Sequence, residues 1–135
     1  MNILLADDVE GWLFFHKKNL LEIYEYKKLN IYTFLSAKTA YDFAFCFNEN
    51  IDLVITDMQM EPMYNQYAGE WLIENLKTLP STKSSKFIII SSAPNIERIK
   101  EKTSADGCLR KGYYNQNPLI LKYLLKEIFT DNFEH

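Results

Sequence analysis

Three aspartates stand at the ends of two short apolar runs. Asp7 and Asp8 directly follow the run at residues 3–6, and Asp57 is the last residue of the run at residues 51–57. The second run is rich in β-branched residues and lies between turn-forming residues, which is typical of a strand buried on both faces. The carboxyl ends of parallel strands meet at one edge of a sheet, where open α/β folds bind their ligands. Carboxylates gathered there repel one another unless a cation binds them.

A hydroxyl and an amine are expected at the same edge. Ser92 follows the apolar run at residues 87–90, and Lys111 follows the short run at residues 108–110. Transfer of a phosphoryl group depends mainly on positioning and on charge neutralisation. A lysine that pairs with the phosphoryl oxygens and a serine hydroxyl that donates a hydrogen bond to them would meet that need.

The acidic residues predict a magnesium site beside a nucleophile. Because Mg²⁺ prefers oxygen ligands, Asp8, Asp57 and the main-chain carbonyl of Gln59 are the predicted direct ligands, and Asp7 is expected to hold a metal-bound water. A carboxylate beside a metal is also a nucleophile toward phosphorus, so Asp57 is the candidate for an aspartyl phosphate. The alternative, that these acids only cap strand ends, is disfavoured because reactive groups arrive from two further strands.

Strands and helices alternate along the whole chain. Apolar runs predict five strands, at residues 2–6, 29–35, 51–57, 87–90 and 108–110. Amphipathic spacing and capping residues predict five helices, at residues 9–28, 37–47, 70–79, 94–99 and 118–128. Regular alternation of this kind predicts an α/β fold, with a parallel sheet covered by helices on both faces.

Some side chains carry their own expectations. The strand at residues 29–35 is apolar on both alternating faces, which predicts burial from two sides. His16 lies among lysines and is expected to be a solvated surface residue without a role. Trp12, Phe14 and Phe15 are expected to serve mainly in core packing, with some exposure because one helix can hide only one stripe.

The composition is that of an ordinary globular protein. The 135 residues are 47% hydrophobic and 24% charged, and the net charge is −3 with scattered lysines and arginines, which gives little support to direct nucleic-acid binding. The absence of a leader sequence and the wide separation of Cys46 and Cys108 favour a cytoplasmic protein with free thiols. No apolar run approaches the length of a membrane span.

Four segments together resemble the response regulator receiver domain of two-component signalling. They are residues 4–8 (LLADD), 52–57 (DLVITD, with a methionine three residues later), 89–93 (IISSA) and 105–111 (ADGCLRK). The resemblance extends over essentially the whole chain and implies a stand-alone receiver at residues 1–135 without an output domain. It implies a flavodoxin-like (βα)5 fold with a five-stranded sheet of order 2-1-3-4-5.

The same resemblance implies a function and its partners. A sensor histidine kinase or a phosphotransfer protein would phosphorylate Asp57 in a Mg²⁺-dependent reaction, with Lys111 and Ser92 contacting the phosphoryl group. The domain would catalyse only its own phosphorylation and slow dephosphorylation, so it is not expected to be an enzyme in the usual sense. Phosphorylation would switch binding to a downstream protein that the sequence does not identify. A monomer or weak homodimer is expected.

Two departures from the family concern the last strand. The lysine of the family is usually followed by a cis-proline, whereas Gly112 follows Lys111 here. A cis bond before a non-proline residue is costly, so a trans bond or a rearranged loop is expected. The aromatic residue that repacks in the family's switch falls at Cys108. Either the coupling is altered, or Tyr113 and Tyr114 take over part of that surface.

Further departures surround the acceptor. The loop at residues 58–69 is enlarged, because Glu61 precedes Pro62 and additional residues follow. It is interpreted either as a variable loop packed by its own side chains or as a lid in which Tyr64 or Tyr67 covers the phosphorylation pocket and slows hydrolysis. Gln59 and Pro94 occupy positions that modulate phosphate loss in the family.

Three other functions are weighed against the receiver. A pseudo-receiver that acts as a phosphorylation-independent interaction module is supported by Gly112, Cys108 and the enlarged loop. A phosphohydrolase of the haloacid dehalogenase type would need a second aspartate where this chain has Gln59. A nucleotide- or flavin-binding protein is disfavoured because no glycine-rich phosphate loop follows any strand.

Overall fold

The computed structural model describes residues 1–130 and contains a five-stranded parallel sheet. The strand order is β2-β1-β3-β4-β5, so the predicted flavodoxin-like α/β fold is confirmed. The strands are β1 (Asn2–Ala6), β2 (Asn30–Phe34), β3 (Leu53–Thr56), β4 (Lys86–Ser91) and β5 (Gly107–Arg110). The helices are α1 (Glu10–Ile23), α2 (Ala37–Cys46), α3 (Ala68–Leu76), α4 (Ile96–Thr103), α5 (Lys111–Gln116) and α6 (Leu119–Ile128).

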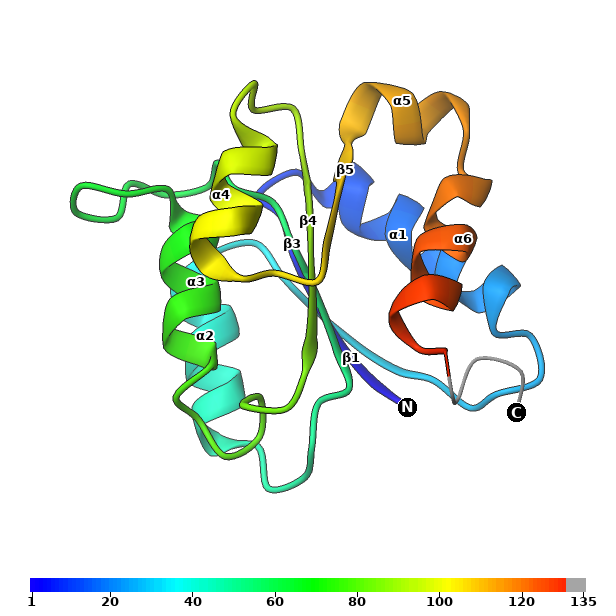
Figure 1. Cartoon of the computed structure of the whole chain (residues 1–135). Coiled ribbons are helices and arrows are strands. Elements are labelled where there is room, and N and C mark those ends of the chain that lie inside the picture. The colour runs from blue at the N-terminus through cyan, green and yellow to red at the C-terminus, as the bar shows by residue number, and fades with distance from the viewer. Residues whose placement is uncertain (131–135) are drawn as a thin grey trace.

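Alternating strand residues divide the interior into two cores, one on each face of the sheet. Helices α2, α3 and α4 cover one face, and α1 and α6 cover the other (Figure 1). Leu4, Val54 and Ile89 point toward the first group, whereas their neighbours on the same strands point toward the second. Because both faces are covered, the central strands have no polar face, which explains their continuous apolar sequences.

Strand β2 packs against the cores on both faces of the sheet, as expected, but it is only partly buried. It is an edge strand that pairs with β1 within the described sheet. Tyr32 and Phe34 pack against Phe43 of α2, with ring centroids 4.7 and 5.1 Å apart, but the edge itself faces solvent. The alternation of apolar residues along a strand predicts which side chains pack against neighbouring helices. It does not predict whether the strand lies at the edge of the sheet.

The helices differ from the expectation at both ends of the chain. Helix α1 ends at Ile23, where the N–H of Tyr24 bonds to the carbonyl of Leu20, and does not continue to residue 28. A separate short helix, α5, follows β5 directly and was not expected. Asn117 ends α5, and α6 begins after Pro118, within one residue of the predicted start.

None of the helices at residues 1–130 combines the length and the apolar character that a membrane crossing requires.

Candidate functional site

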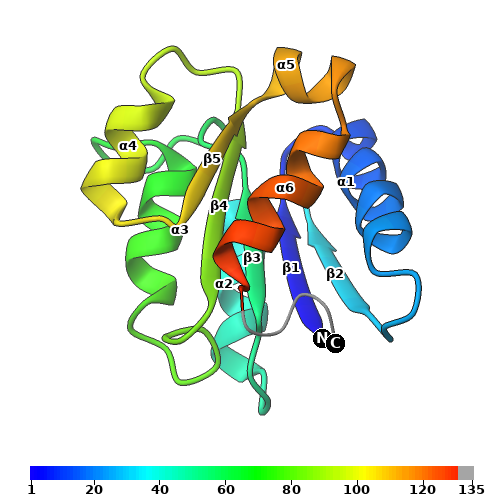
Figure 2. The same cartoon turned by 45° about the vertical axis from the view of Figure 1, so that its right-hand side comes forward.

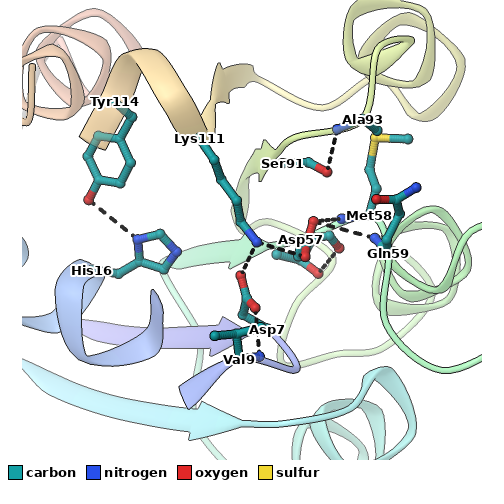
Figure 3. A network of polar contacts seen from close by, with 11 residues as sticks. Asp7, Val9, His16, Asp57, Met58, Gln59, Ser91, Ala93, Lys111 and Tyr114 are labelled. Carbon is teal, nitrogen blue, oxygen red and sulfur yellow. Dashed lines mark hydrogen bonds and ion pairs between the residues drawn. The ribbon is translucent and has the colours of Figure 1, made fainter. Parts of the chain in front are cut away.

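Three charged side chains meet at the carboxyl edge of the sheet. Asp7 directly follows β1, Asp57 directly follows β3, and Lys111 directly follows β5. Strands β1 and β3 are neighbours with Ala6 opposite Thr56, so the two aspartates leave the sheet side by side. The Lys111 Nζ lies 2.9 Å from Asp7 Oδ2 and 2.9 Å from Asp57 Oδ2 (Figure 3). The structure therefore brings together three of the predicted site residues.

Asp57 is held in place by main-chain groups on both sides. Its side chain is 5% exposed, and its Oδ1 accepts hydrogen bonds from the N–H of Met58 at 2.7 Å and of Gln59 at 3.4 Å. Gly69, in the first turn of α3, packs directly against its carbonyl group. A Cβ atom on Gly69 would lie 2.0 Å from that oxygen, so this position accepts no side chain without movement of the backbone.

Burial and charge act in opposite directions on these groups. Burial raises the pKa of Asp7 above its ordinary value, although hydrogen bonds from Lys111 and from the N–H of Val9 favour the ionised form. Burial tends to lower the pKa of Lys111, but its hydrogen bonds to Asp7 and Asp57 outweigh burial, so that pKa is raised. Lys111 therefore stays charged, and the cluster favours additional positive charge.

The donor set fits a magnesium ion. Asp7, Asp8 and Asp57 each offer a carboxylate oxygen, and these atoms lie within 4.8 Å of one another. The set consists of hard oxygen ligands, and a single lysine offsets only one of three negative charges. Asp8 is exposed, which leaves the cluster open to solvent. The assignment of the Gln59 carbonyl as a further ligand stays a prediction.

The serine predicted to contact a phosphoryl group lies at the same edge but faces solvent. Ser92 is the first residue after β4, and its side chain is exposed, whereas the hydroxyl of Ser91 is buried and accepts a hydrogen bond from the N–H of Ala93 at 3.2 Å. The guanidinium of Arg110 donates to the carbonyls of Ala93 and Pro94, at 3.3 Å each, and so ties this loop to β5.

A buried aromatic and polar network next to Lys111 was missed by the sequence reasoning. His16 is 2% exposed, so the prediction of a solvated histidine is wrong. Its Nδ1 lies 3.4 Å from the hydroxyl of Tyr114, which also accepts a hydrogen bond from Asn19 at 3.1 Å. Burial, followed by the charge of Lys111, lowers the pKa of His16 to about 4. The four-residue spacing of Trp12, His16 and Leu20 was the available signal, because it places His16 on the buried face.

The enlarged loop is anchored away from Asp57. The carboxylate of Glu61 accepts hydrogen bonds from the N–H groups of Ala37, at 2.9 Å, and Lys38, at 3.0 Å, and so caps the start of α2. The tip of the loop projects beyond α3 and α4 (Figure 1). Tyr64 is 89% exposed, and with Tyr67 it lines a hollow of about 500 Å³ between the loop and α4. This arrangement favours a loop packed by its own side chains over a lid.

The residues around the last strand separate into different environments. Cys108 is half-buried against the core under α2, α3 and α4, and both cysteines are free thiols in the described chain. The Lys111–Gly112 peptide bond is trans, as expected. Tyr113 is largely exposed, whereas Tyr114 is fully buried under α1. Of the two tyrosines, only Tyr114 has the packing of a core residue.

No family model and no curated protein matches the chain. Several solved structures, in contrast, match the fold of the chain. The chemotaxis response regulator CheY4 of Vibrio cholerae superposes with a TM-score of 0.74 at 18% identity, covering 95% of this chain and 98% of that one. A response regulator receiver domain protein from Clostridium thermocellum gives 0.72 at 23% identity, covering 96% and 94%. RcsB from Salmonella enterica serovar Typhimurium, bound to promoter rprA, gives 0.71 at 23% identity, covering 95% and 98%.

The chain has the fold of a receiver domain. The resemblance noted from four sequence segments is thus confirmed at the level of the fold. On this receiver fold, Asp7, Asp57 and Lys111 occupy the ends of β1, β3 and β5, as those segments predicted.

Proposed function

We propose that this chain is a cytoplasmic phosphoacceptor of two-component signalling, with Asp57 as the phosphorylated residue. The observation that supports the proposal is the bridge from Lys111 to Asp7 and Asp57, because carboxylates and a cation then lie together at the ligand-binding edge of a receiver fold. The donor would be a phosphohistidine of a sensor kinase or of a phosphotransfer protein. The phosphorylated form would bind a downstream protein, and the chain would act on no other substrate.

In the proposed reaction, an oxygen of Asp57 attacks phosphorus while the bond from phosphorus to the donor nitrogen breaks. The electron pair of that bond stays on the imidazole, and an acyl phosphate forms on Asp57. The N–H groups of Met58 and Gln59 orient the carboxylate. The ammonium of Lys111, already next to Asp57, is placed to pair with the phosphoryl oxygens. Ser92 would donate its hydroxyl hydrogen to them.

The residues that would hold Mg²⁺ are Asp8, Asp57 and the Gln59 carbonyl, with Asp7 holding a bound water. When present, the ion supplies positive charge against the phosphoryl oxygens. Slow attack of water on phosphorus would then break its bond to the Asp57 oxygen, releasing inorganic phosphate and restoring the carboxylate, which limits the lifetime of the phosphorylated form.

The main support for a phosphorylation-independent module is weakened by the geometry. Gly112 was one reason to doubt the placement of Lys111, yet the Lys111 ammonium lies within hydrogen-bond distance of Asp57. Cys108, which packs against the core under α2, α3 and α4, still bears on how a switch would operate.

The test is the intact mass of the protein after incubation with acetyl phosphate, with and without Mg²⁺. We expect a single phosphoryl adduct that requires Mg²⁺ and is lost in Asp57→Asn. Asp52→Asn is a matched control, because Asp52 precedes the same strand at the opposite edge and binds the N–H of Asn2 at 2.7 Å. An adduct that persists in Asp57→Asn would refute the assignment, and the absence of any adduct in the wild type would refute the function.

A further inference from the structure

Lys111 occupies an unusual junction. Strand β5 ends at Arg110 and α5 begins at Lys111, so the lysine is the first residue of a helix. Its side chain extends from the start of α5 to Asp7 and Asp57 and is only 9% exposed (Figure 3). The position of its ammonium therefore depends on the direction in which α5 leaves the sheet and on the groups that surround the side chain.

Trp12 provides a third contact for the ammonium. The Lys111 Nζ lies over the face of the Trp12 indole ring, 5.1 Å from the ring centroid, in the geometry of a cation–π interaction. Trp12 is in the first turn of α1, close in sequence to Asp7. Unlike the two carboxylates, the indole face offers the ammonium a contact that carries no net charge.

Tyr114 anchors the helix that carries Lys111. It lies three residues after Lys111, one turn along α5, and is fully buried. Its ring stacks on Trp12, with centroids 6.3 Å apart and planes at 24°, and on His16, at 5.6 Å and 27°. A helix of six residues is not stable alone, so this docking fixes its orientation. Figure 2 shows α5 at the carboxyl edge, above α1 and α6.

We propose that Trp12 and Tyr114 are positioning residues for Lys111. Trp12 holds the ammonium through its ring face, and Tyr114 holds the backbone of Lys111 by docking α5 onto α1. The inference deepens the proposed function, because its consequence is faster transfer of a phosphoryl group to Asp57. The position of Lys111 itself depends only on its contact with Trp12 and on the packing of Tyr114.

The geometry can be tested in the unmodified protein by nuclear magnetic resonance of selectively labelled lysine. A side chain over an indole face has its methylene protons shifted upfield by the ring current, and Lys111→Arg identifies the signal by removing it. We expect the upfield shift to disappear in Trp12→Leu and to survive in part in Trp12→Phe. Phe14→Leu is the matched control, since Phe14 is on the same helix but 71% exposed.

The consequence can be tested by the rate of phosphoryl uptake from acetyl phosphate at saturating Mg²⁺. We expect Trp12→Leu to lower this rate about threefold to tenfold, with Trp12→Phe restoring part of it, as the usual strength of such contacts indicates. Tyr114→Leu should lower it as well, while Tyr114→Phe, which keeps the ring, should stay closer to the wild type. The denaturant midpoint of each variant shows whether a lower rate arises only because less of the protein is folded.

The outcomes separate the two proposals. An unchanged Lys111 signal in Trp12→Leu would overturn the positioning role, as would phosphoryl uptake by Trp12→Leu at the wild-type rate. If the wild type takes up no phosphoryl group, the proposed function fails, and the lysine signal, measured in Trp12→Leu and in Tyr114→Leu, alone decides whether these two residues position Lys111.

Discussion

His16 and Lys111 show how differently two buried basic residues behave in the same region of the protein. Lys111 is compensated by two carboxylates, so it retains its charge despite burial. His16 faces the rings of Trp12 and Tyr114 and lies near the lysine charge, so protonation would add a second cation to an apolar region. A neutral imidazole is therefore part of the packed structure, and this has a consequence for stability.

The stability of the protein should fall below pH 6.5 because of His16. The pKa of this residue is about 4 in the folded protein and 6.5 when unfolded, so the unfolded chain binds a proton first as the pH falls. From pH 7 to pH 5, the free energy of unfolding should drop by about 2 kcal/mol more in the wild type than in His16→Gln. Urea unfolding at the two pH values measures this difference. The raised pKa of Asp7 acts in the opposite direction and is common to both proteins. Equal losses in both would contradict the burial of a neutral histidine.

Site residues differ in how well the sequence predicts them. Asp7, Asp57 and Lys111 were predictable as neighbours, because each directly follows an apolar run and parallel strands end at one edge. The exposure of Ser92 was not predictable, since it depends on β4 ending at Ser91 rather than one residue later. The role of Tyr114 depends on the direction of α5, which no local pattern encodes.

At the scale of elements, the connection from β3 to α3 is held at two points. Near its middle, Glu61 binds two main-chain N–H groups at the start of α2, where the partial positive charge of a helix favours a carboxylate. At its end, Gly69 allows α3 to begin in direct contact with the Asp57 carbonyl, and its N–H bonds to the carbonyl of Met58. Asp57 is therefore packed against the start of α3 although the loop tip is exposed.

Gly69→Ala should destabilise the protein. The added Cβ would clash with backbone atoms of Asp57 and Met58, which cannot rotate away as a side chain can. We expect a loss of about 2 kcal/mol or more in the free energy of unfolding, measured by urea denaturation. Gly11→Ala is the matched control, because a Cβ there meets nothing within 4 Å, and alanine should stabilise α1 by about 0.5–1 kcal/mol. Equal stability of the two variants would exclude a close contact at Gly69.

The elements themselves were largely predictable, and the failures have identifiable causes. The apolar runs and the turn residues that flank them predict all five strands, because each strand has apolar side chains that pack into the cores. Helix α1 was extended too far, because the backbone leaves helical geometry at Tyr24, which is still buried, and Tyr26 beyond it is 96% exposed. Helix α5 was missed because tertiary contacts of one residue, Tyr114, stabilise it rather than an apolar stripe.

At the scale of the whole molecule, acidic groups and one lysine share the carboxyl edge of the sheet. The free energy of folding includes the repulsion among Asp7, Asp8 and Asp57, which a bound cation would remove. Folding and ion binding are therefore linked, because only the folded chain assembles these three carboxylates.

Mg²⁺ should stabilise the wild type and act much less on Asp8→Ala. At a Mg²⁺ concentration 100 times the Kd, the linkage contributes about 2.7 kcal/mol, which a thermal or urea denaturation series detects. Asp8 is exposed, so its removal leaves the core intact and should slightly stabilise the metal-free protein. Asp42→Ala, which removes an exposed acid on α2, should respond to Mg²⁺ as the wild type does. An equal response of Asp8→Ala would exclude Asp8 as a ligand.

The contact between Trp12 and Lys111 also gives the molecule an optical probe. The chain has two tryptophans, and Trp71 of α3 packs against Tyr41, with ring centroids 5.5 Å apart, on the other face of the sheet. Trp71→Phe would leave a single fluorophore whose indole face carries a positive charge at 5.1 Å. Any displacement of that charge changes the electric field across the excited state, so the emission wavelength would report the lysine's movement without an attached label.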